Sequence, residues 1–412
     1  MDHVRSLQCM ICGREYAPGE EDYTCPSCGP EGILDVIYDY DRISSRFTRE
    51  ILAGRRERSI WRYTELLPVA PDGPRPPLQI GWTPLVRADR LNRSLGFPNL
   101  YIKDDGRNPT ASFKDRASAV GVVKALEGGH TTIACASTGN AASSLAGIAA
   151  SAGLETVIFV PRTAPRAKVA QLLIHGARVF LVRSSYDQAF DLCLEAAGRF
   201  GWYNRNTAIN PYLSEGKKTA ALEICEQLDW RAPDTVFVSV GDGCIIGGLW
   251  KGFHDLLQLG FIDRMPRLAG VQARGCQPVK RAWETDRPVE PVEAETLADS
   301  IAVGHPRDAL KALRAVRQSG GFMMAVSDEE ILQAMRRMAS ETGIFGEPAG
   351  VTGFAGFLQA LSGGHVQKDE RVVVVMTGHG LKDIEGALRA TRAPMEIDPT
   401  LEALTESMGE KG

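Results

Sequence analysis

From residue 98 onward, short apolar runs alternate with longer segments of helical periodicity, and this alternation limits the fold more than any other feature. Strand–helix alternation of this kind predicts parallel sheets joined by right-handed crossovers. We therefore predict an α/β protein. Strands are expected at residues 99–103, 131–137, 155–160, 178–182, 235–240, 267–272 and 371–376, and helices at residues 115–127, 139–152, 165–175, 186–199, 213–229, 245–259, 328–341 and 348–361.

The remaining segments have weaker patterns. The charged segment 42–62 is expected to form one or two helices, and the proline-rich stretch 68–77 to be a linker. Residues 275–325 are rich in proline and charge and are expected to be less regular. The tail after Pro394 is expected to be a terminal helix or disordered.

Length and composition indicate an ordinary soluble protein. A chain of 412 residues with 44% hydrophobic and 24% charged residues suits two or three domains. A net charge of -4 gives no reason to expect a nucleic-acid or membrane partner. The longest apolar runs fall far short of the roughly 20 residues of a membrane helix. Residues 1–8 lack the apolar core of a signal peptide, so a cytoplasmic protein is expected.

Four of the nine cysteines form two CxxC pairs, Cys9–Cys12 and Cys25–Cys28. Two such turns can present four thiolates to Zn²⁺ at about 2.3 Å each. Residues 1–40 are too few to bury a core, so bound metal would supply the folding energy of this module. Fortuitous cysteines or a redox pair are the alternatives. Acidic Glu20 and Glu31 flank the pairs, which favours a scaffold over a nucleic-acid site.

One lysine, Lys114, lies in a polar turn just before a helical pattern. A lysine becomes a nucleophile for a Schiff base when burial lowers its pKa. The alternative is a solvated lysine at a helix start, an unfavourable end for a cation. Two other stretches, 137–140 and 241–248, can supply amides for a carboxylate and a cradle for a phosphate. Pyridoxal 5'-phosphate with an amino-acid substrate requires all three groups.

Stretch 137–140 ends an apolar strand and opens a helix made almost entirely of small residues. Such a helix is expected to be buried, with its N-terminal amides directed at an anion. Ordinary N-caps are the alternative, because serine, threonine and asparagine favour that position. The candidate residues are Ser137, Thr138, Gly139 and Asn140.

Stretch 241–248 follows another apolar strand, and its glycines let backbone N–H groups approach a phosphate. A dinucleotide fold is the rival, but its fingerprint has the spacing G-x-G-x-x-G, whereas this stretch reads G-x-G-x-x-x-G-G. Asp242 must direct its carboxylate away from a phosphate dianion. The candidate phosphate-binding residues are Gly241, Asp242, Gly243, Cys244 and Ile245.

Thr377 follows the most apolar strand, where α/β sheets place ligands. It could also merely terminate the strand. A neutral hydroxyl beside a pyridine nitrogen would leave the cofactor a weaker electron sink than an aspartate would, which favours elimination over transamination. His379 has no assigned role.

These motifs resemble those of the fold-type II pyridoxal-phosphate enzymes, and most closely the threonine synthase family with an N-terminal cysteine module. The resemblance rests on the paired CxxC, GWTPL at 81–85, NPTASFKDR at 108–116, STGN at 137–140, EGKKT at 215–219, the glycine stretch, SDEEI at 327–331, EP at 347–348 and TGHGLKD at 377–383. It implies two three-layer α/β/α domains with mostly parallel sheets, beside a zinc-ribbon-like module of residues 1–40. The large domain would comprise residues 41–112 and 206–412, and the small domain residues 113–205.

The resemblance also implies roles for the candidate residues. Lys114, with Phe113 beside it, would carry the cofactor as a Schiff base, and Asn140 would bond its 3'-oxygen. Thr377 would face the pyridine nitrogen, and residues 137–139 would receive the substrate carboxylate. The reaction would be elimination of phosphate from O-phosphohomoserine followed by addition of water, in a homodimer.

Some positions depart from the family's pattern. Thr207 and Ala208 replace an Asn-Ser pair, and Leu213 stands where an arginine for the substrate phosphate is expected. Arg205 and Lys217 are possible substitutes. Dehydration of threonine or serine, or β-replacement on an activated serine, is therefore the alternative activity. An amino-acid-binding protein without catalysis is the alternative of another class, and it requires a solvated Lys114.

Overall fold

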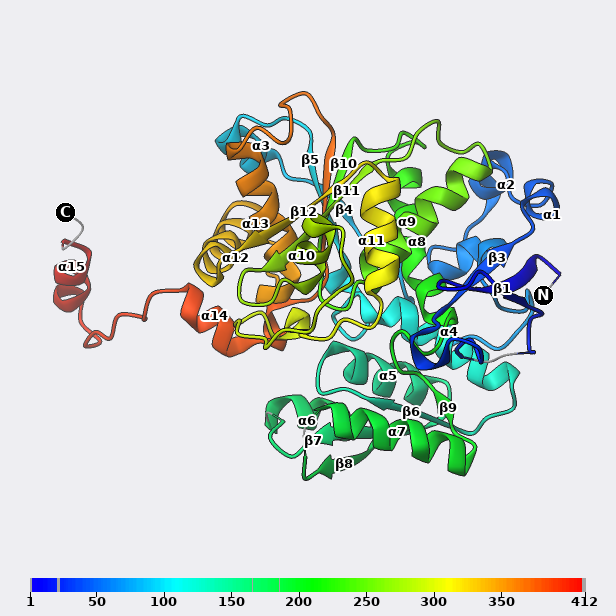
Figure 1. Cartoon of the computed structure of the whole chain (residues 1–412). Helices are drawn as coiled ribbons and strands as arrows, with labels where there is room; N and C mark the ends of the chain where they lie inside the picture. Colours follow the sequence, from blue (N-terminus) through cyan, green and yellow to red (C-terminus); the bar gives the residue numbers. More distant parts are fainter. Residues whose placement is uncertain (1, 21–22, 165, 185, 410–412) are drawn as a thin grey trace.

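The computed structural model describes residues 2–20, 23–164, 166–184 and 186–409. Two mostly parallel sheets and one small antiparallel sheet form the protein, which confirms the predicted α/β class (Figure 1). Within the described part of the chain, no helix combines the length and apolarity needed to cross a membrane.

The six-stranded sheet has the order β12-β11-β10-β13-β5-β4, and only β4 runs antiparallel to its neighbour. Alternate residues of β13 face opposite sides: Val373 and Val375 belong to one buried cluster, and Val372 and Val374 to another. Helices therefore cover both faces, as a three-layer arrangement requires. The strands are β4 (Leu85–Arg87), β5 (Leu100–Asp104), β10 (Thr235–Ser239), β11 (Arg267–Ala273), β12 (Phe322–Val326) and β13 (Val372–Met376).

Helices α8, α9 and α11 contribute to the first cluster, and α12 and α13 to the second. Smaller helices join these elements. The bounds are α3 (Asp89–Leu95), η3 (Asp105–Arg107), α8 (Tyr212–Gln227), α9 (Cys244–Gln258), α10 (Pro278–Thr285), η4 (Asp299–Ile301), α11 (Ala309–Gln318), α12 (Asp328–Thr342), α13 (Pro348–Ser362) and η5 (Gly380–Lys382).

The second sheet is fully parallel, with the order β8-β7-β6-β9, and lies below the larger one in Figure 1. Helix α7 packs against one face, and α4 and α5 lie on the other. Residue 165, where one expected helix begins, lies outside the described residues. The elements are α4 (Lys114–Glu127), β6 (Thr132–Ala136), α5 (Asn140–Ser151), β7 (Glu155–Pro161), α6 (Arg166–Leu173), β8 (Arg178–Val182), α7 (Tyr186–Phe200) and β9 (Tyr203–Asn204).

The cysteine module is a three-stranded antiparallel sheet of the order β2-β1-β3. We expected it to lack a core, but Leu7, Val36 and Tyr38 are buried in the same cluster as α8 and α9. The body of the protein therefore supplies the apolar partner that 40 residues cannot provide alone. The elements are β1 (Val4–Cys9), β2 (Glu15–Tyr16), η1 (Gly29–Glu31) and β3 (Leu34–Tyr38).

The lower regularity expected for residues 275–325 is found in 286–308, which hold only η4, but the rest of the segment forms α10, α11 and most of the edge strand β12. Strand β12 follows Gly321, where a Cβ atom would lie 2.1 Å from the carbonyl oxygen of Leu268. The position of β12 therefore depends on close contact between the backbones at Gly321 and Leu268, which local sequence periodicity does not indicate. The charged segment forms α1 (Tyr40–Ser44), α2 (Arg49–Gly54) and η2 (Ile60–Leu66), and the C-terminal region forms α14 (Ile384–Ala390) and α15 (Leu401–Gly409), the last apart from the body (Figure 1).

Candidate active site

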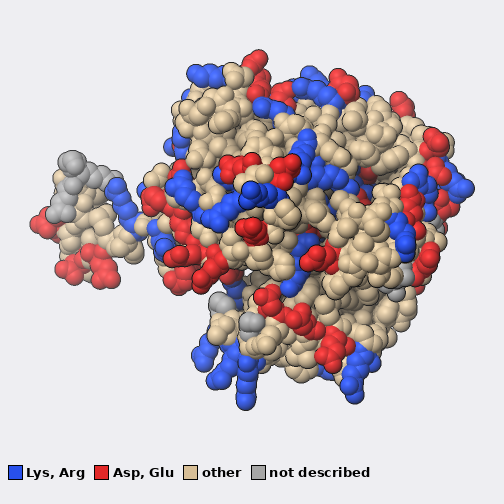
Figure 2. Space-filling view, in the orientation of Figure 1, with Lys and Arg blue, Asp and Glu red and all other residues tan. Residues whose placement is uncertain are grey.

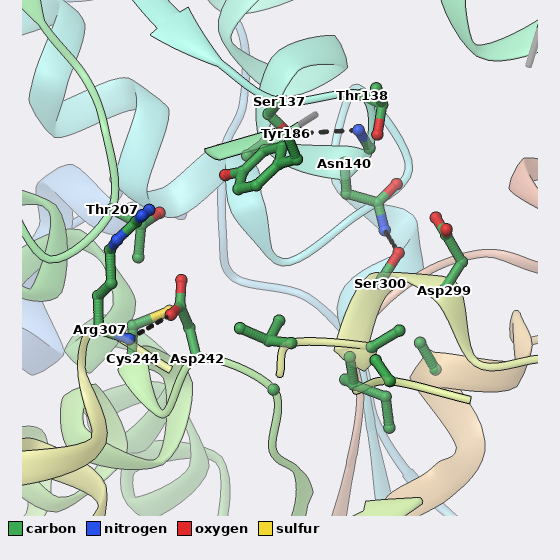
Figure 3. Close-up of a pocket in the computed structure, with 18 of the residues that line it drawn as sticks. Ser137, Thr138, Asn140, Tyr186, Thr207, Asp242, Cys244, Asp299, Ser300 and Arg307 are labelled. Carbon is green, nitrogen blue, oxygen red and sulfur yellow. Dashed lines mark hydrogen bonds between the residues drawn. The ribbon is translucent and has the colours of Figure 1, made fainter. Parts of the chain in front are cut away.

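A cavity of about 640 Å³ lies where strands of both parallel sheets end. Residues that follow β6, β10 and β13 meet there, together with the first residue of α4. Figure 3 shows those that follow β6 and β10, among them Ser137 and Asp242. The cavity brings together almost every candidate residue of the sequence analysis, although these come from distant parts of the chain. Its lining includes Lys114, Ser137, Thr138, Gly139, Asn140, Gly241, Asp242, Gly243, Cys244, Ile245 and Thr377.

The lysine loop is fixed to the end of β13 by backbone contacts. The N–H of Phe113 donates to the carbonyl oxygen of Thr377 at 2.8 Å, and Ser112 forms an antiparallel bridge with Gly378. The N–H of Thr110 donates to the Asp115 carboxylate at 2.7 Å, which closes the turn. These bonds hold the start of α4, and with it Lys114, against the sheet edge.

Lys114 itself is half-buried and lines the cavity. No hydrogen bond or ion pair joins its amine to another of the described residues. The amine is therefore neither paired with a carboxylate nor fully solvated. Phe113, in contrast, is 1% exposed, lies beneath the Arg116 guanidinium and does not line the cavity.

Residues 137–140 form the N-terminal turn of α5. The N–H of Gly139 donates to Ser137 Oγ at 3.2 Å, and no side chain caps the helix. The Asn140 amide is directed elsewhere: its Nδ2 donates to Glu347 Oε1 at 2.6 Å. It also donates to Ser300 Oγ at 3.4 Å (Figure 3). Asn140 is thus not an ordinary cap, and the N-terminal amides of α5 face the cavity.

The glycine loop has a shape that only glycine permits. Gly243 has a φ of +99°, and a Cβ atom there would lie 2.8 Å from both the Asp308 carbonyl oxygen and the Ala312 side chain. A Cβ atom at Gly241 would lie 2.9 Å from Ile301 Cα. Helix α9 then begins at Cys244 without a side-chain cap, so its first N–H groups remain available to an anion.

Asp242 accepts hydrogen bonds from the backbone of residues 307 and 308. Its Oδ1 accepts from the N–H of Arg307 at 2.9 Å, and its carbonyl oxygen accepts from the N–H of Asp308 (Figure 3). Burial raises the pKa of Asp242, although the hydrogen bond from the N–H of Arg307 opposes this shift. The carboxylate therefore stabilises the loop through the 307–308 segment.

Three residues of the site were missed by sequence reasoning, namely Glu347, Ser300 and Tyr186. Glu347 is buried, and burial raises its pKa to about 7 although Lys382 and Asn140 oppose this shift. A Cβ atom at Gly378 would lie 2.2 Å from its Oε1, so the glycine after Thr377 makes room for this carboxyl. Ser300 comes from the segment predicted to be irregular, where no pattern indicates a site.

The other candidates are placed as follows. Thr377 is 8% exposed at the cavity wall, and His379 accepts a hydrogen bond from the N–H of Leu381, so it caps η5. Thr207 and Arg205 line the cavity. Three candidates of the same region are outside the lining, namely Ala208, Leu213 and Lys217.

The four cysteines of the N-terminal module converge. The Sγ atoms of Cys9, Cys12, Cys25 and Cys28 all lie within 4.8 Å of one another, and Cys12 and Cys25 are 3.8 Å apart. A tetrahedron with Zn–S distances of about 2.3 Å has edges of about 3.8 Å. The geometry and the donor set therefore suit Zn²⁺.

Comparison with known proteins identifies the family. The family model described as "Pyridoxal-phosphate dependent enzyme" matches residues 77–378. A threonine synthase of Methanocaldococcus jannaschii is 41% identical over 406 residues, which cover 98% of this chain and 99% of the relative. The chain belongs to the threonine synthase family of pyridoxal-phosphate dependent enzymes. The threonine synthase of Methanosarcina acetivorans is 42% identical over 98% of each chain.

Solved structures agree with this family at the level of the fold. A processed threonine deaminase of Solanum lycopersicum superposes with a TM-score of 0.63 at 22% identity, covering 75% of this chain and 87% of that one. A diaminopropionate ammonia lyase of Escherichia coli gives a TM-score of 0.64 at 20% identity, covering 75% and 86%. Both cover less of this chain than the threonine synthase relatives from the two methanogens do.

Proposed function

We propose that this enzyme is a threonine synthase that converts O-phosphohomoserine and water into threonine and phosphate. The observation that carries the proposal is identity of about 40% to threonine synthases across nearly the whole chain, cysteine module included. The cavity supports it, because an uncapped helix start, a glycine loop and Lys114, which has no ion pair among the described residues, line one space.

The residues of the cavity fit pyridoxal 5'-phosphate. Lys114 would hold the cofactor covalently, the loop from Gly241 to Ile245 would bind its phosphate, and Asn140 and Thr377 would contact its ring. When bound, this cofactor withdraws electrons from the substrate carbon that loses a proton. The left-handed Gly243 and the uncapped start of α9 are the features of this chain that suit a phosphate.

The protein's own contribution is positioning and proton transfer. We propose that Ser137, Thr138 and Gly139 bind the substrate carboxylate at the start of α5. Lys114 Nζ would accept the proton from the substrate α carbon, because it faces the cavity without a competing partner among the described residues. Glu347, whose pKa is about 7, would keep Asn140 oriented.

We further propose a structural Zn²⁺ on Cys9, Cys12, Cys25 and Cys28, and a homodimer in the cytoplasm with small-molecule rather than nucleic-acid partners. Acidic and basic side chains are interspersed over the face in Figure 2, which supports the absence of a polyanionic partner. The cysteine sulfurs support the metal by their mutual distances.

Phosphate release tests the proposal. Purified enzyme should be yellow and should release phosphate from O-phosphohomoserine with formation of threonine. Borohydride should fix the chromophore to the peptide that contains Lys114, and Lys114→Ala should lose both the adduct and activity by a factor of at least about 1,000. Formation of a 2-oxo acid from threonine without phosphate release would instead indicate a dehydratase. A colourless protein without the adduct would leave only the binding function.

A further inference from the structure

The cavity contains a buried cation that forms no ion pair with a carboxylate of the described residues. Arg205 follows β9, is 1% exposed and lines the cavity. Within the described part of the chain its guanidinium makes one hydrogen bond, to Ser118 Oγ at 3.3 Å, and its Nε has no partner. A guanidinium carries five N–H donors, so most of its bonding capacity is unused.

Leaving this charge unpaired is costly to the fold, because a buried ion without a partner loses its hydration. Burial accordingly lowers the pKa of Arg205. Several other buried cations, among them Lys103, Arg116 and Lys218, avoid the cost through ion pairs. Arg116, for example, bonds the carboxylates of both Asp105 and Glu223. The exception at Arg205 therefore indicates an anion that arrives with a ligand.

The surroundings of Arg205 favour an oxyanion. Thr207 and Cys244 lie on the same side of the cavity, away from Asn140 and Ser300 (Figure 3). Lys217 is also buried without an ion-pair partner among the described residues, and its stem packs against Gly248 of α9. Arg205 and the uncapped start of α9 thus line the cavity, and Lys217, outside the lining, adds a positive charge near Cys244.

Leu213 and Arg205 lie near the same residue of α4. A Cβ atom at Gly121 of α4 would lie 3.0 Å from Leu213 Cδ2 and 3.8 Å from Arg205 Cγ. Both side chains therefore pack over the same glycine. Leu213 is apolar and contributes no charge of its own. The positive charge next to Leu213 is therefore that of the Arg205 guanidinium.

We propose that Arg205 binds the phosphate group of the substrate and so selects phosphorylated amino acids. This inference rests on the proposed function, which brings two phosphates into one cavity. The glycine loop and the start of α9 offer amides to the phosphate of the cofactor. A second phosphate needs a second set of donors, and Arg205, assisted by the charge of Lys217, provides it.

The test uses the holoenzyme, in which the phosphate site of the cofactor is already filled. Inorganic phosphate should raise the Tm of the wild type, and Arg205→Met should abolish this rise. The KM for O-phosphohomoserine should increase roughly 10- to 100-fold, because bonds to a charged group are lost. Arg205→Lys should retain part of both effects. Without phosphate, Arg205→Met should be at least as stable as the wild type, since an unpaired buried charge is removed.

Arg307→Met is the matched control, because Arg307 also lines the cavity but already pairs with Asp187 and stacks on Phe190. It should retain the phosphate-dependent rise in Tm. Equal loss in both variants, or an unchanged rise in Arg205→Met, would overturn the assignment. A lower Tm of Arg205→Met with normal phosphate response would indicate a structural residue.

Cofactor affinity shows whether Arg205 binds the phosphate of the substrate or the phosphate of the cofactor. The Kd of pyridoxal 5'-phosphate, measured by absorbance titration of the apoenzyme, should change less than about twofold in Arg205→Met. A large loss of cofactor affinity with an intact phosphate response would assign Arg205 to the cofactor and refute the proposal. If the wild type does not turn over O-phosphohomoserine, the proposed function fails, whereas the Tm response to phosphate still decides whether Arg205 binds that anion.

Discussion

Replacing Glu223 by glutamine should strongly destabilise the protein, because Glu223 belongs to a buried cluster of four charges. Its Oε1 lies 2.5 Å from Arg116 Nη1 and its Oε2 lies 2.7 Å from Lys103 Nζ, while Arg116 also bonds Asp105 at 2.6 Å. All four side chains are 0% exposed. Through Arg116, which lies two residues after Lys114, the cluster attaches α4 to α8 and β5.

The magnitude follows from the charge balance of the cluster. Two cations and two anions cancel in the wild type, and Glu223→Gln leaves one positive charge uncompensated in the core. Breaking a buried pair in this way costs about 3–5 kcal/mol. The pKa of Glu223 gives a second estimate: burial opposes ionisation, but Arg116 and Lys103 outweigh it and lower the pKa to about 2. Relative to an ordinary value near 4.5, this corresponds to about 3 kcal/mol at neutral pH.

The pH dependence has a definite sign. Because the pKa of Glu223 is depressed in the folded protein, its contribution is fully present above pH 4.5 and is lost as the pH falls towards 2. The difference in free energy of unfolding between wild type and Glu223→Gln should therefore decline by roughly half between pH 7 and pH 3.

Urea unfolding followed by circular dichroism measures this difference. Glu284→Gln is the matched control, because Glu284 forms an exposed ion pair with Lys280 in α10 and should contribute less than about 0.5 kcal/mol. A loss below about 1 kcal/mol in Glu223→Gln, or a difference that does not change with pH, would refute the electrostatic reasoning.

Three further results are expected. Cys25→Ser should reduce the zinc content of purified protein from about one equivalent to near zero, and unchanged zinc on elemental analysis would exclude the site. Gly243→Ala should weaken cofactor binding at least about tenfold in absorbance titrations, because the added Cβ atom would collide with Asp308. Gly260→Ala is the control and should not weaken binding, because Gly260 also has a positive φ, +71°, but no atom lies near its Cβ position. Wild-type apoprotein should lose about 3 kcal/mol of stability as the pH rises from 4.5 to 7, because the folded state holds the Glu347 proton. Urea titrations of Glu347→Gln should not show this loss of stability. Parallel pH profiles of the two proteins would contradict the prediction.

Much of the fold and the site could be predicted from local patterns. The strand–helix alternation specified the central elements to within about two residues, since apolar periodicity and turn residues are local properties. The candidate residues at strand ends converge because parallel strands bring their carboxyl ends to one edge. Strand β12 was missed because its place depends on a backbone approach at Gly321.

The sequence by itself determined which chemical groups the protein carries: an amine at Lys114, amides at two helix starts and four cysteine thiols. The tertiary structure alone decided how these groups are partnered. Asn140 bonds a carboxyl 207 positions away, and Arg205 lies buried without an ion pair to any of the residues that the structure describes. Burial and pairing depend on residues distant in the chain, and these contacts set the charge and pKa that determine what each group can do.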